Sequence, residues 1–355
     1  MPNQKGARAM RLHGLGVAIG LLAASAAVPA AAGATLPKLG TELPATSVSG
    51  LSSGAYMAGQ IEIAHSKDIV GAGIVAGGPF ACAESPLASA FPYWPTAVAQ
   101  NGTQALLRCM KTTMGTPDPD RLVTRAKELA EKGEIDPLSA LARHNVYLYS
   151  GDNDATVTRP VVKAAKRFYD LAGVPASNVT FVTGDGGHAF ITEEGGAACG
   201  VSEPPYVSDC DYDQARAILG WIYGPLEPSS DAAQGAFVVF DQENFSDAGD
   251  GFAGEGVVYV PASCRTAPGC RVHVSLHGCG QSREKIGDTF IRDSGFARIA
   301  DTNRIVMLFP QISASAYNPE GCWDWWGYTG LDFLGKDAAQ INAIWSMVEH
   351  LAKQE

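Results

Sequence analysis

Between residues 45 and 224, two hydrophobic patterns alternate along the chain. Short apolar runs rich in β-branched residues are typical of buried strands, and longer stretches with apolar residues three or four positions apart are typical of helices. Strands are expected at 45–50, 69–78, 144–151 and 178–184, and helices at 54–66, near 119–132, at 158–173 and at 211–224. Strands that alternate with helices predict an α/β fold with a mostly parallel sheet covered on both faces.

The pattern changes after residues 225–235, a polar stretch rich in Pro, Ser and Ala that is typical of a linker. Three predicted strands follow with little helix between them, and then a helix, a strand and a closing helix. The three strands are expected at 236–240, 256–261 and 270–278. The helix, strand and closing helix after them are expected at about 283–300, 303–311 and 335–353.

A candidate nucleophile lies near the start of this pattern. Gly50-Leu51-Ser52-Ser53-Gly54 fits G-x-S-x-G, the strained strand-to-helix turn that presents the serine of α/β-hydrolases. In that fold the serine follows the fifth strand, whereas here it follows the first. Three strands, then helix, strand and helix are how an α/β-hydrolase begins, and this series occupies the C-terminal part. The sequence therefore predicts a circularly permuted α/β-hydrolase, with 225–235 joining the old end to the old beginning.

The acid and the base of a catalytic triad should follow later strands in that order. Asp152 and Asp154 come directly after the strand at 144–151, and Asp154 is preferred because it lies further into the loop. His188 lies on the Gly-rich loop after 178–184 and is the expected general base. Asp154 would orient the imidazole and stabilise its charged form.

An oxyanion hole is expected from two backbone N–H groups. One belongs to Ser53, the residue after the nucleophile, and the other to Cys279 in the His-Gly turn of VSLHGCGQ. The alternative for this second segment is an ordinary strand-to-helix turn.

Residues 321–328, GCWDWWGY, concentrate aromatic side chains without helix or strand periodicity. Exposed aromatic rings suit an apolar polymer or acyl chain, so four residues are expected to bind substrate: Trp323, Trp325, Trp326 and Tyr328. A packing cluster beneath a long loop is the alternative.

The eight cysteines and the N-terminal sequence indicate an exported protein. Residues 1–34 combine a basic start, a short apolar core and small residues at the end, as a cleaved signal peptide does, with an uncleaved membrane anchor as the alternative. An even number of cysteines in an oxidising compartment suggests four disulfides. Short spacings favour Cys199–Cys210 and Cys264–Cys270, which leaves Cys82–Cys109 and Cys279–Cys322, although other pairings are possible. No C-x-x-C pair or H-x-x-x-H helix indicates a zinc site.

The formal net charge of −11 argues against nucleic acid or an anionic membrane surface as partner. A secreted or periplasmic protein is therefore expected, with residues 35–355 as one catalytic domain and no separate polymer-binding domain. A monomer is the simplest oligomeric state.

Four segments in order, GLSSGAYMAGQ, YSGDNDATV, GDGGHAF and SLHGCGQ, resemble the secreted polyhydroxyalkanoate depolymerases with a circularly permuted catalytic domain. The resemblance implies a triad of Ser52, Asp154 and His188, oxyanion donors in Ser53 and Cys279, and polyester contact by Trp323. It also implies hydrolysis of poly(3-hydroxybutyrate) or a related short-side-chain polyester through an acyl-enzyme, without a cofactor. Amorphous polymer or oligomers are the expected substrates.

Two alternatives remain. A carboxylesterase or hydroxybutyrate-oligomer hydrolase would use the same residues on small soluble esters. A non-catalytic polymer-binding protein would have kept the fold alone, and the complete set of candidate catalytic residues argues against it.

Overall fold

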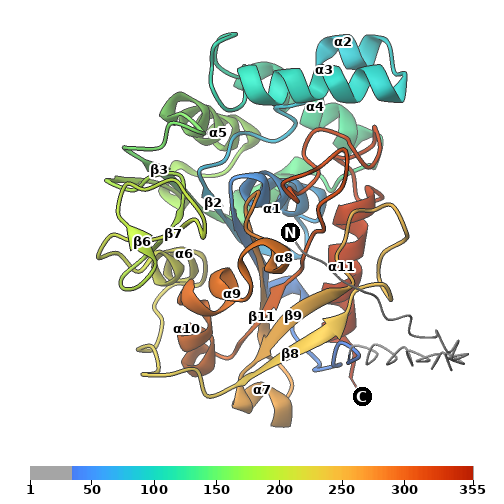
Figure 1. The fold of residues 1–355 in the computed structure, drawn as a ribbon. Helices are drawn as coiled ribbons and strands as arrows, with labels where there is room; N and C mark the ends of the chain where they lie inside the picture. Colours follow the sequence, from blue (N-terminus) through green and yellow to red (C-terminus); the bar gives the residue numbers. More distant parts are fainter. Residues whose placement is uncertain (1–33, 355) are drawn as a thin grey trace, which may run out of the picture. The chain divides into compact units, whose positions relative to one another are not determined.

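An eight-stranded sheet forms the centre of the computed structural model, which describes residues 34–354 (Figure 1). In spatial order its strands are β4 (Val179–Gly184), β3 (Asn145–Gly151), β2 (Ile69–Val75), β1 (Thr46–Leu51), β10 (Arg271–Leu276), β11 (Ile305–Phe309), β9 (Glu255–Val260) and β8 (Ala236–Asp241). β9 is antiparallel to both neighbours, and the other pairs are parallel. The signal peptide predicted at 1–34 falls, apart from Ala34, outside the described residues.

The join between the early and the late part of the chain lies in the middle of this sheet. Ser47 to Gly50 of β1 pair with His273 to Leu276 of β10. One half of the sheet therefore comes from the beginning of the chain and the other from its end, coloured blue to green and yellow to orange in Figure 1. This order confirms the predicted permuted α/β fold. Residues 225–235, all of them described, contain neither helix nor strand and connect α6 (Gln214–Tyr223) to β8.

Eleven α-helices accompany the sheet in the described part of the chain. They are α1 (Ser53–Ala64), α2 (Pro86–Ala90), α3 (Trp94–Leu107), α4 (Pro119–Glu131), α5 (Arg159–Ala172), α6 (Gln214–Tyr223), α7 (Ala262–Thr266), α8 (Arg283–Ile286), α9 (Thr289–Asp293), α10 (Phe296–Asn303) and α11 (Ala339–Ala352). Figure 1 shows α6 and α10 on one side of the sheet and α11 on the other, as the predicted two-sided covering requires. Short 3-10 turns occur at Leu43–Ala45, Leu138–Arg143 and Ala176–Asn178.

The single helix predicted at 283–300 is wrong, because this stretch forms α8, α9 and α10. Gly287 ends α8 with φ of +63°, and Gly295 precedes α10 with φ of +87°. Both angles lie in the left-handed region, which glycine adopts without steric cost and which cannot continue an α-helix.

Buried apolar strands build the core. Every residue of β1 and β11 is buried, and β2 and β10 each have a single partly exposed residue. Parallel strands that are covered on both faces read as apolar runs, as β2 and β11 do, whereas β1 and β10 also bury polar side chains such as Ser47, Ser49 and His273. One contiguous cluster includes apolar residues from both halves of the chain.

Three short strands were not predicted. β5 (Phe190–Thr192), β6 (Ala197–Ala198) and β7 (Val207–Asp209) form a separate small sheet in which β7 is central. Runs of two or three residues are too short for a recognisable alternation. This small sheet follows His188 directly in the chain.

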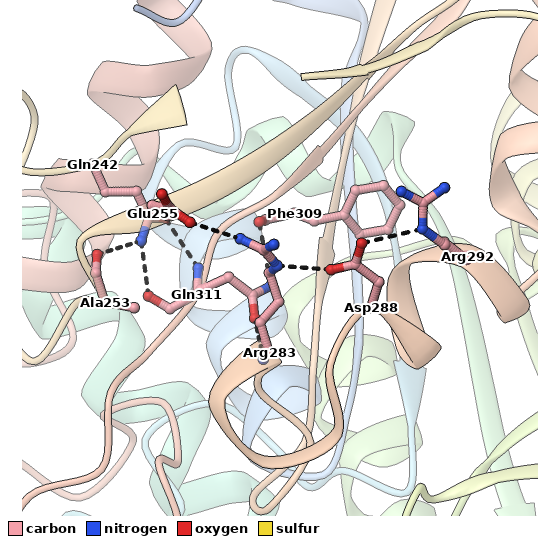
Figure 2. A network of polar contacts seen from close by, with 8 residues as sticks. All are labelled: Gln242, Ala253, Glu255, Arg283, Asp288, Arg292, Phe309 and Gln311. Atoms are coloured by element: carbon pink, nitrogen blue, oxygen red, sulfur yellow. Dashed lines mark hydrogen bonds and ion pairs between the residues drawn. The ribbon is translucent and has the colours of Figure 1, made fainter. Parts of the chain in front are cut away.

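The segment around α8 is fixed by a polar network (Figure 2). Arg283 forms ion pairs with Asp288 at 2.8 Å and with Glu255 at 3.1 Å. The backbone N–H of Arg283 donates to Gln311 Oε1 at 2.8 Å, and the backbone N–H of Gln311 donates to Gln242 Oε1 at 3.0 Å. These bonds join β9 and the ends of β8 and β11 to α8, which follows the segment of residues 277–282.

Candidate active site

Ser52 lies on the turn between β1 and α1, where a nucleophile elbow is expected. Its φ of 56° and ψ of −119° place a non-glycine residue in a conformation that is rarely populated. The backbone N–H of Ser52 donates to Val75 O at 2.9 Å, which fixes the turn to β2. The serine is buried, with 6% of its surface exposed.

The two glycines of the motif are required by close backbone packing. A Cβ on Gly50 would lie 2.3 Å from the carbonyl carbon of Gly54. A Cβ on Gly54 would lie 2.3 Å from Leu276 O and 2.5 Å from His277 O. The elbow therefore packs directly against the end of β10, and only glycine allows that approach.

Asp154 and His188 are brought together as predicted. Asp154 Oδ2 lies 2.9 Å from His188 Nδ1, and Oδ1 accepts from the backbone N–H groups of Thr156 at 2.7 Å and Val157 at 2.9 Å. A carboxylate can only accept, so Nδ1 carries the proton and Nε2 remains available as a base. Asp152 instead pairs with Arg159, which leaves Asp154 as the partner of the histidine.

The loop that carries His188 has no room for larger residues. A Cβ on Gly187 would lie 2.6 Å from Gly200 O, and a Cβ on Gly151 would lie 2.2 Å from Gly186 O. The backbone N–H of His188 donates to Ser202 Oγ at 2.7 Å. These contacts hold the imidazole loop against the end of β3, from which Asp154 projects.

The Ser52 hydroxyl has no hydrogen-bond partner among the described residues, His188 included. Catalytic hydrogen bonds are often long in the absence of substrate and shorten when it binds. Asp154 and His188 are thus in contact. The hydrogen bond between His188 and Ser52 is expected to form when substrate binds.

The backbone N–H groups of Ser53 and Cys279 make no hydrogen bond to another described residue. Ser53 is the first residue of α1, so its N–H has no partner within the helix. Because the elbow packs against His277, these two amides belong to neighbouring segments. Two unpaired N–H groups beside a serine are what an oxyanion hole requires.

His277 fixes the segment that leads to Cys279. Its Nδ1 lies 2.8 Å from Gly278 O and its Nε2 lies 3.3 Å from the backbone N–H of Ile312. The first contact requires a protonated Nδ1 and the second an unprotonated Nε2, so the ring is neutral. Burial lowers the pKa of His277 to about 4, which agrees with this tautomer.

Further bonds hold Cys279 itself. A disulfide joins Cys279 to Cys322, and Gly280 N–H donates to Glu320 O at 2.7 Å. Gln281 accepts from Gly278 N–H at 2.8 Å and donates to the carbonyls of Pro205 and Tyr206. The structure also contains the other three expected pairs, Cys82–Cys109, Cys199–Cys210 and Cys264–Cys270.

The aromatic cluster differs from the expectation. Trp323, Trp325 and Tyr328 are buried and Trp326 is partly buried, so the expected exposure of the first three is wrong, and their contact with substrate stays a prediction. Trp323 Nε1 donates to His277 O at 3.0 Å, and Trp325 stacks on Tyr56 with ring centroids 3.9 Å apart. The rings pack beneath a long loop and support the Cys279 segment from within.

Asp324, between these tryptophans, was missed in the sequence. Its two carboxylate oxygens accept from four backbone N–H groups, those of residues 326–329, at 2.6–3.2 Å, and from Thr329 Oγ1 at 2.7 Å. The side chain is buried, and desolvation raises its pKa. The available signal was an acidic residue between two tryptophans. A carboxylate buried among aromatic rings needs several hydrogen-bond donors, so this position could have been expected to organise the backbone around it.

Neither a metal site nor a membrane span is present in the part of the chain that the structure describes. Residues 34–354 contain no group of three or more His, Cys, Asp or Glu side chains placed to hold a metal ion. They also contain no helix that is long and apolar enough to cross a membrane.

Comparisons with known proteins agree on one family, although no protein-family profile matches the chain. The chain is 38% identical over 327 residues to a poly(3-hydroxybutyrate) depolymerase of Delftia acidovorans, covering 90% of this chain and 62% of that protein. It is 34% identical over 353 residues to a polyhydroxybutyrate depolymerase of Talaromyces funiculosus, covering 94% of this chain and 97% of the relative.

Two solved structures have similar folds. One is a PHB depolymerase complexed with an R3HB trimer, with a TM-score of 0.80 and 33% identity, covering 90% of this chain and 99% of that one. The other is the crystal structure of the PHB depolymerase from Penicillium funiculosum, with a TM-score of 0.79 and the same identity and coverage. This chain belongs to the polyhydroxybutyrate depolymerase family.

Proposed function

We propose that this chain hydrolyses ester bonds of poly(3-hydroxybutyrate) or a related short-side-chain polyester. Two relatives are named as depolymerases of this polymer, and one similar structure holds an R3HB trimer. The observation that carries the proposal is the strained turn of Ser52 packed against the segment of Cys279. This arrangement supports a serine nucleophile with oxyanion donors on both sides.

In the proposed reaction, Ser52 Oγ attacks the ester carbonyl carbon and its proton passes to His188 Nε2. The N–H groups of Ser53 and Cys279 stabilise the oxyanion. The C–O bond to the outgoing hydroxyacyl unit then breaks, and His188 returns the proton to the departing alcohol oxygen. Water hydrolyses the acyl-enzyme by the same steps in reverse, with Asp154 orienting the imidazole throughout.

A hydrolase of soluble hydroxybutyrate oligomers is the second candidate. It is favoured by the burial of Trp323, Trp325 and Tyr328, because these rings cannot lie on a polymer surface. The two candidates share the same chemistry and differ only in the physical state of the substrate.

Turbidity of amorphous polyhydroxybutyrate granules incubated with the protein tests the proposal, with Ser52→Ala as the inactive control and Asp152→Asn as the matched acidic control. We expect clearing by the unaltered protein and by Asp152→Asn, and none by Ser52→Ala. Hydrolysis of soluble trimer without clearing would replace the polymer proposal by the oligomer proposal. Hydrolysis that persists in Ser52→Ala would refute both.

The location of the protein also belongs to this proposal. We infer export and removal of residues 1–34, which leaves residues 35–355 as a single catalytic domain that acts as a monomer. N-terminal sequencing of the protein from culture medium or periplasm tests the cleavage, and sedimentation equilibrium tests the monomer.

A further inference from the structure

Gln281 is a buried glutamine that binds backbone groups with both ends of its side-chain amide. It is 1% exposed. Its Oε1 accepts from Gly278 N–H at 2.8 Å, and its Nε2 donates to Pro205 O at 3.1 Å and to Tyr206 O at 2.9 Å. A backbone N–H can only donate and a carbonyl can only accept, so these three partners fix which way the amide points. One side chain thus joins the segment of Cys279 to residues 75 and 76 positions earlier in the chain.

On one side, Gln281 holds the peptide group that carries the Cys279 N–H. This peptide is trans, so its N–H and its carbonyl, which is Gly278 O, point in opposite directions. Gly278 O accepts from His277 Nδ1 at 2.8 Å and from Gln281 N–H at 3.3 Å. Because the carbonyl is held by these two donors, the Cys279 N–H points away from them, and it has no partner among the described residues.

Packing alone does not fix this peptide at Gly278. A Cβ at this position would meet Leu51 at 3.4 Å, an ordinary contact, so space does not require glycine here. Glycine has the freest backbone of all residues, which lets the adjoining peptides rotate. A rotated peptide would present Gly278 O to the site in place of the Cys279 N–H and remove one oxyanion donor. The bonds from Gln281 oppose that rotation, because they hold the peptides before and after Gly278.

On its other side, Gln281 binds the segment from Ser202 to Tyr206, which holds the loop of the candidate base. Ser202 Oγ accepts from His188 N–H at 2.7 Å. Tyr206 O, a partner of Gln281, also accepts from Phe190 N–H at 2.9 Å. Gln281 therefore reaches the same backbone that places the imidazole.

We propose that Gln281 is a positioning residue that keeps the Cys279 N–H turned into the active site as an oxyanion donor and fixes its place relative to His188. This inference rests on the proposed function and adds a residue that acts through backbone bonds. In ester hydrolysis the oxyanion and the leaving oxygen are bonded to the same carbon, so the oxyanion donors and the base must be placed relative to each other. An error of about 1 Å in such an arrangement can cost about 100-fold in rate.

A purely structural role is the competing explanation, and a second glutamine provides the control for it. Gln242 is 0% exposed, and its Oε1 accepts from Gln311 N–H at 3.0 Å. Its Nε2 donates to Ala253 O at 2.7 Å and to Gln311 O at 3.0 Å. Gln242 therefore makes the same three kinds of bond just after β8 (Figure 2), outside the candidate triad and oxyanion hole.

The experiment compares Gln281→Met with Gln242→Met, in which a side chain of similar size makes none of the three bonds. Kinetics on a soluble short-chain ester give kcat and KM, and thermal unfolding gives Tm. Inhibition by a short alkyl boronic acid reports on the oxyanion hole, because its adduct with Ser52 places a boron-bound oxygen where the oxyanion forms.

We expect Gln281→Met to lower kcat at least about tenfold and to keep KM within about threefold, because one oxyanion donor is misplaced. Its affinity for the boronic acid should fall by about the same factor as kcat. Gln242→Met should lower Tm as much and keep kcat within about twofold. A loss of kcat in Gln281→Met no greater than in Gln242→Met, or an unchanged affinity for the boronic acid, would overturn the inference.

Gln281→Glu is the second variant, because it has the same shape and can fold where Gln281→Met does not. One oxygen still accepts from Gly278 N–H, while the other, when ionised, faces two carbonyls that cannot donate to it. Protonation supplies one O–H donor, so the ratio of kcat in Gln281→Glu to kcat in the unaltered protein should be low at about pH 8 and rise towards about pH 6. Taking the ratio removes the titration of His188, which both proteins share. A ratio near one over the whole range would overturn the inference.

The same assays separate this inference from the proposed function. Ester hydrolysis that requires Ser52 and is unaffected in both Gln281 variants would refute the inference alone. Hydrolysis of soluble ester without clearing of granules would refute the polymer proposal and leave the inference standing. An unaltered protein that hydrolyses no ester would refute both.

Discussion

The indole Nε1 of Trp323 donates a hydrogen bond of 3.0 Å to the carbonyl oxygen of His277. Two residues later in the chain, Cys279 carries an N–H that has no partner among the described residues. The fully buried Trp323 thus contacts the backbone that leads to the candidate oxyanion hole.

Replacing Trp323 by Phe should lower kcat on a soluble ester and leave the ratio of polymer to soluble-ester activity unchanged. The substitution leaves a buried carbonyl unpaired and a gap in the core, at a cost of about 2–4 kcal/mol in the free energy of unfolding. Kinetics on soluble ester and granules, together with urea unfolding, measure both effects.

Trp325→Phe is the matched control, because Trp325 stacks on Tyr56 and can be replaced by a smaller ring in the same place. It should cost less kcat than Trp323→Phe. A selective loss of activity on granules in Trp323→Phe would restore direct polymer contact and contradict the structure.

Replacing Asp324 by Asn should destabilise the loop of residues 322–329. The carboxylate accepts from four backbone N–H groups and from the Thr329 hydroxyl, and an amide can accept only through its oxygen. We expect a loss of about 1–3 kcal/mol in the free energy of unfolding. Thr329→Val, which removes one donor from the same carboxylate, should cost less. Equal melting temperatures for Asp324→Asn and the unaltered protein would contradict this role.

Opening the disulfide between Cys279 and Cys322 should affect both stability and catalysis. The bond closes 43 residues, for which the loss of chain entropy corresponds to about 4 kcal/mol. Cys279→Ser/Cys322→Ser should therefore lower the free energy of unfolding by roughly this amount and also lower kcat. Urea unfolding and soluble-ester kinetics measure the two effects.

The control is Cys264→Ser/Cys270→Ser, because this pair spans 6 residues at the opposite end of β10. It should cost about 2 kcal/mol and leave kcat unchanged. Equal effects of the two double variants on kcat would mean that the Cys279 disulfide does not position the oxyanion hole.

Stability should fall as the pH falls below about 6.5. Burial lowers the pKa of His273 to about 3 and that of His277 to about 4. Between pH 6.5 and 4 the unfolded chain binds protons at these positions and the folded chain does not, so unfolding becomes easier with acidification. Each histidine contributes about 1.4 kcal/mol per pH unit over this range.

His273→Gln should reduce this slope by about 1.4 kcal/mol per pH unit, because glutamine does not titrate. It can still bond with Ser47 and Ser49, the partners of His273. Urea unfolding at pH 7.5, 6 and 5 gives the slope for both proteins. An unchanged slope in His273→Gln would show that His273 titrates alike in the folded and unfolded chains.

How far the sequence predicts this molecule depends on how local the responsible contacts are. The turn of Ser52, the candidate acid Asp154 and the candidate base His188 each follow a strand within a few residues, so motif and pattern pointed to all three. The positions of the main strands followed from the same alternation, because buried parallel strands are rich in apolar residues.

The aromatic residues could not be placed from the sequence, because exposure depends on distant contacts. Trp323 is buried by its contact with His277 and Trp325 by its contact with Tyr56, both remote in the chain. Trp94, in a segment for which no element was predicted, is exposed instead. Hydrophobicity alone does not distinguish an aromatic residue that packs from one that faces solvent.

The central claim is that Ser52 forms the covalent intermediate. The most direct measurement is mass spectrometry of the protein mixed with hydroxybutyrate trimer and quenched in acid after a short time, followed by peptide mapping. We expect a hydroxybutyryl ester on Ser52 in the unaltered protein and none in Ser52→Ala. In His188→Ala the ester should form more slowly, because the base that takes the serine proton is missing. An acyl group on another residue, or turnover with Ser52 replaced, would contradict this claim.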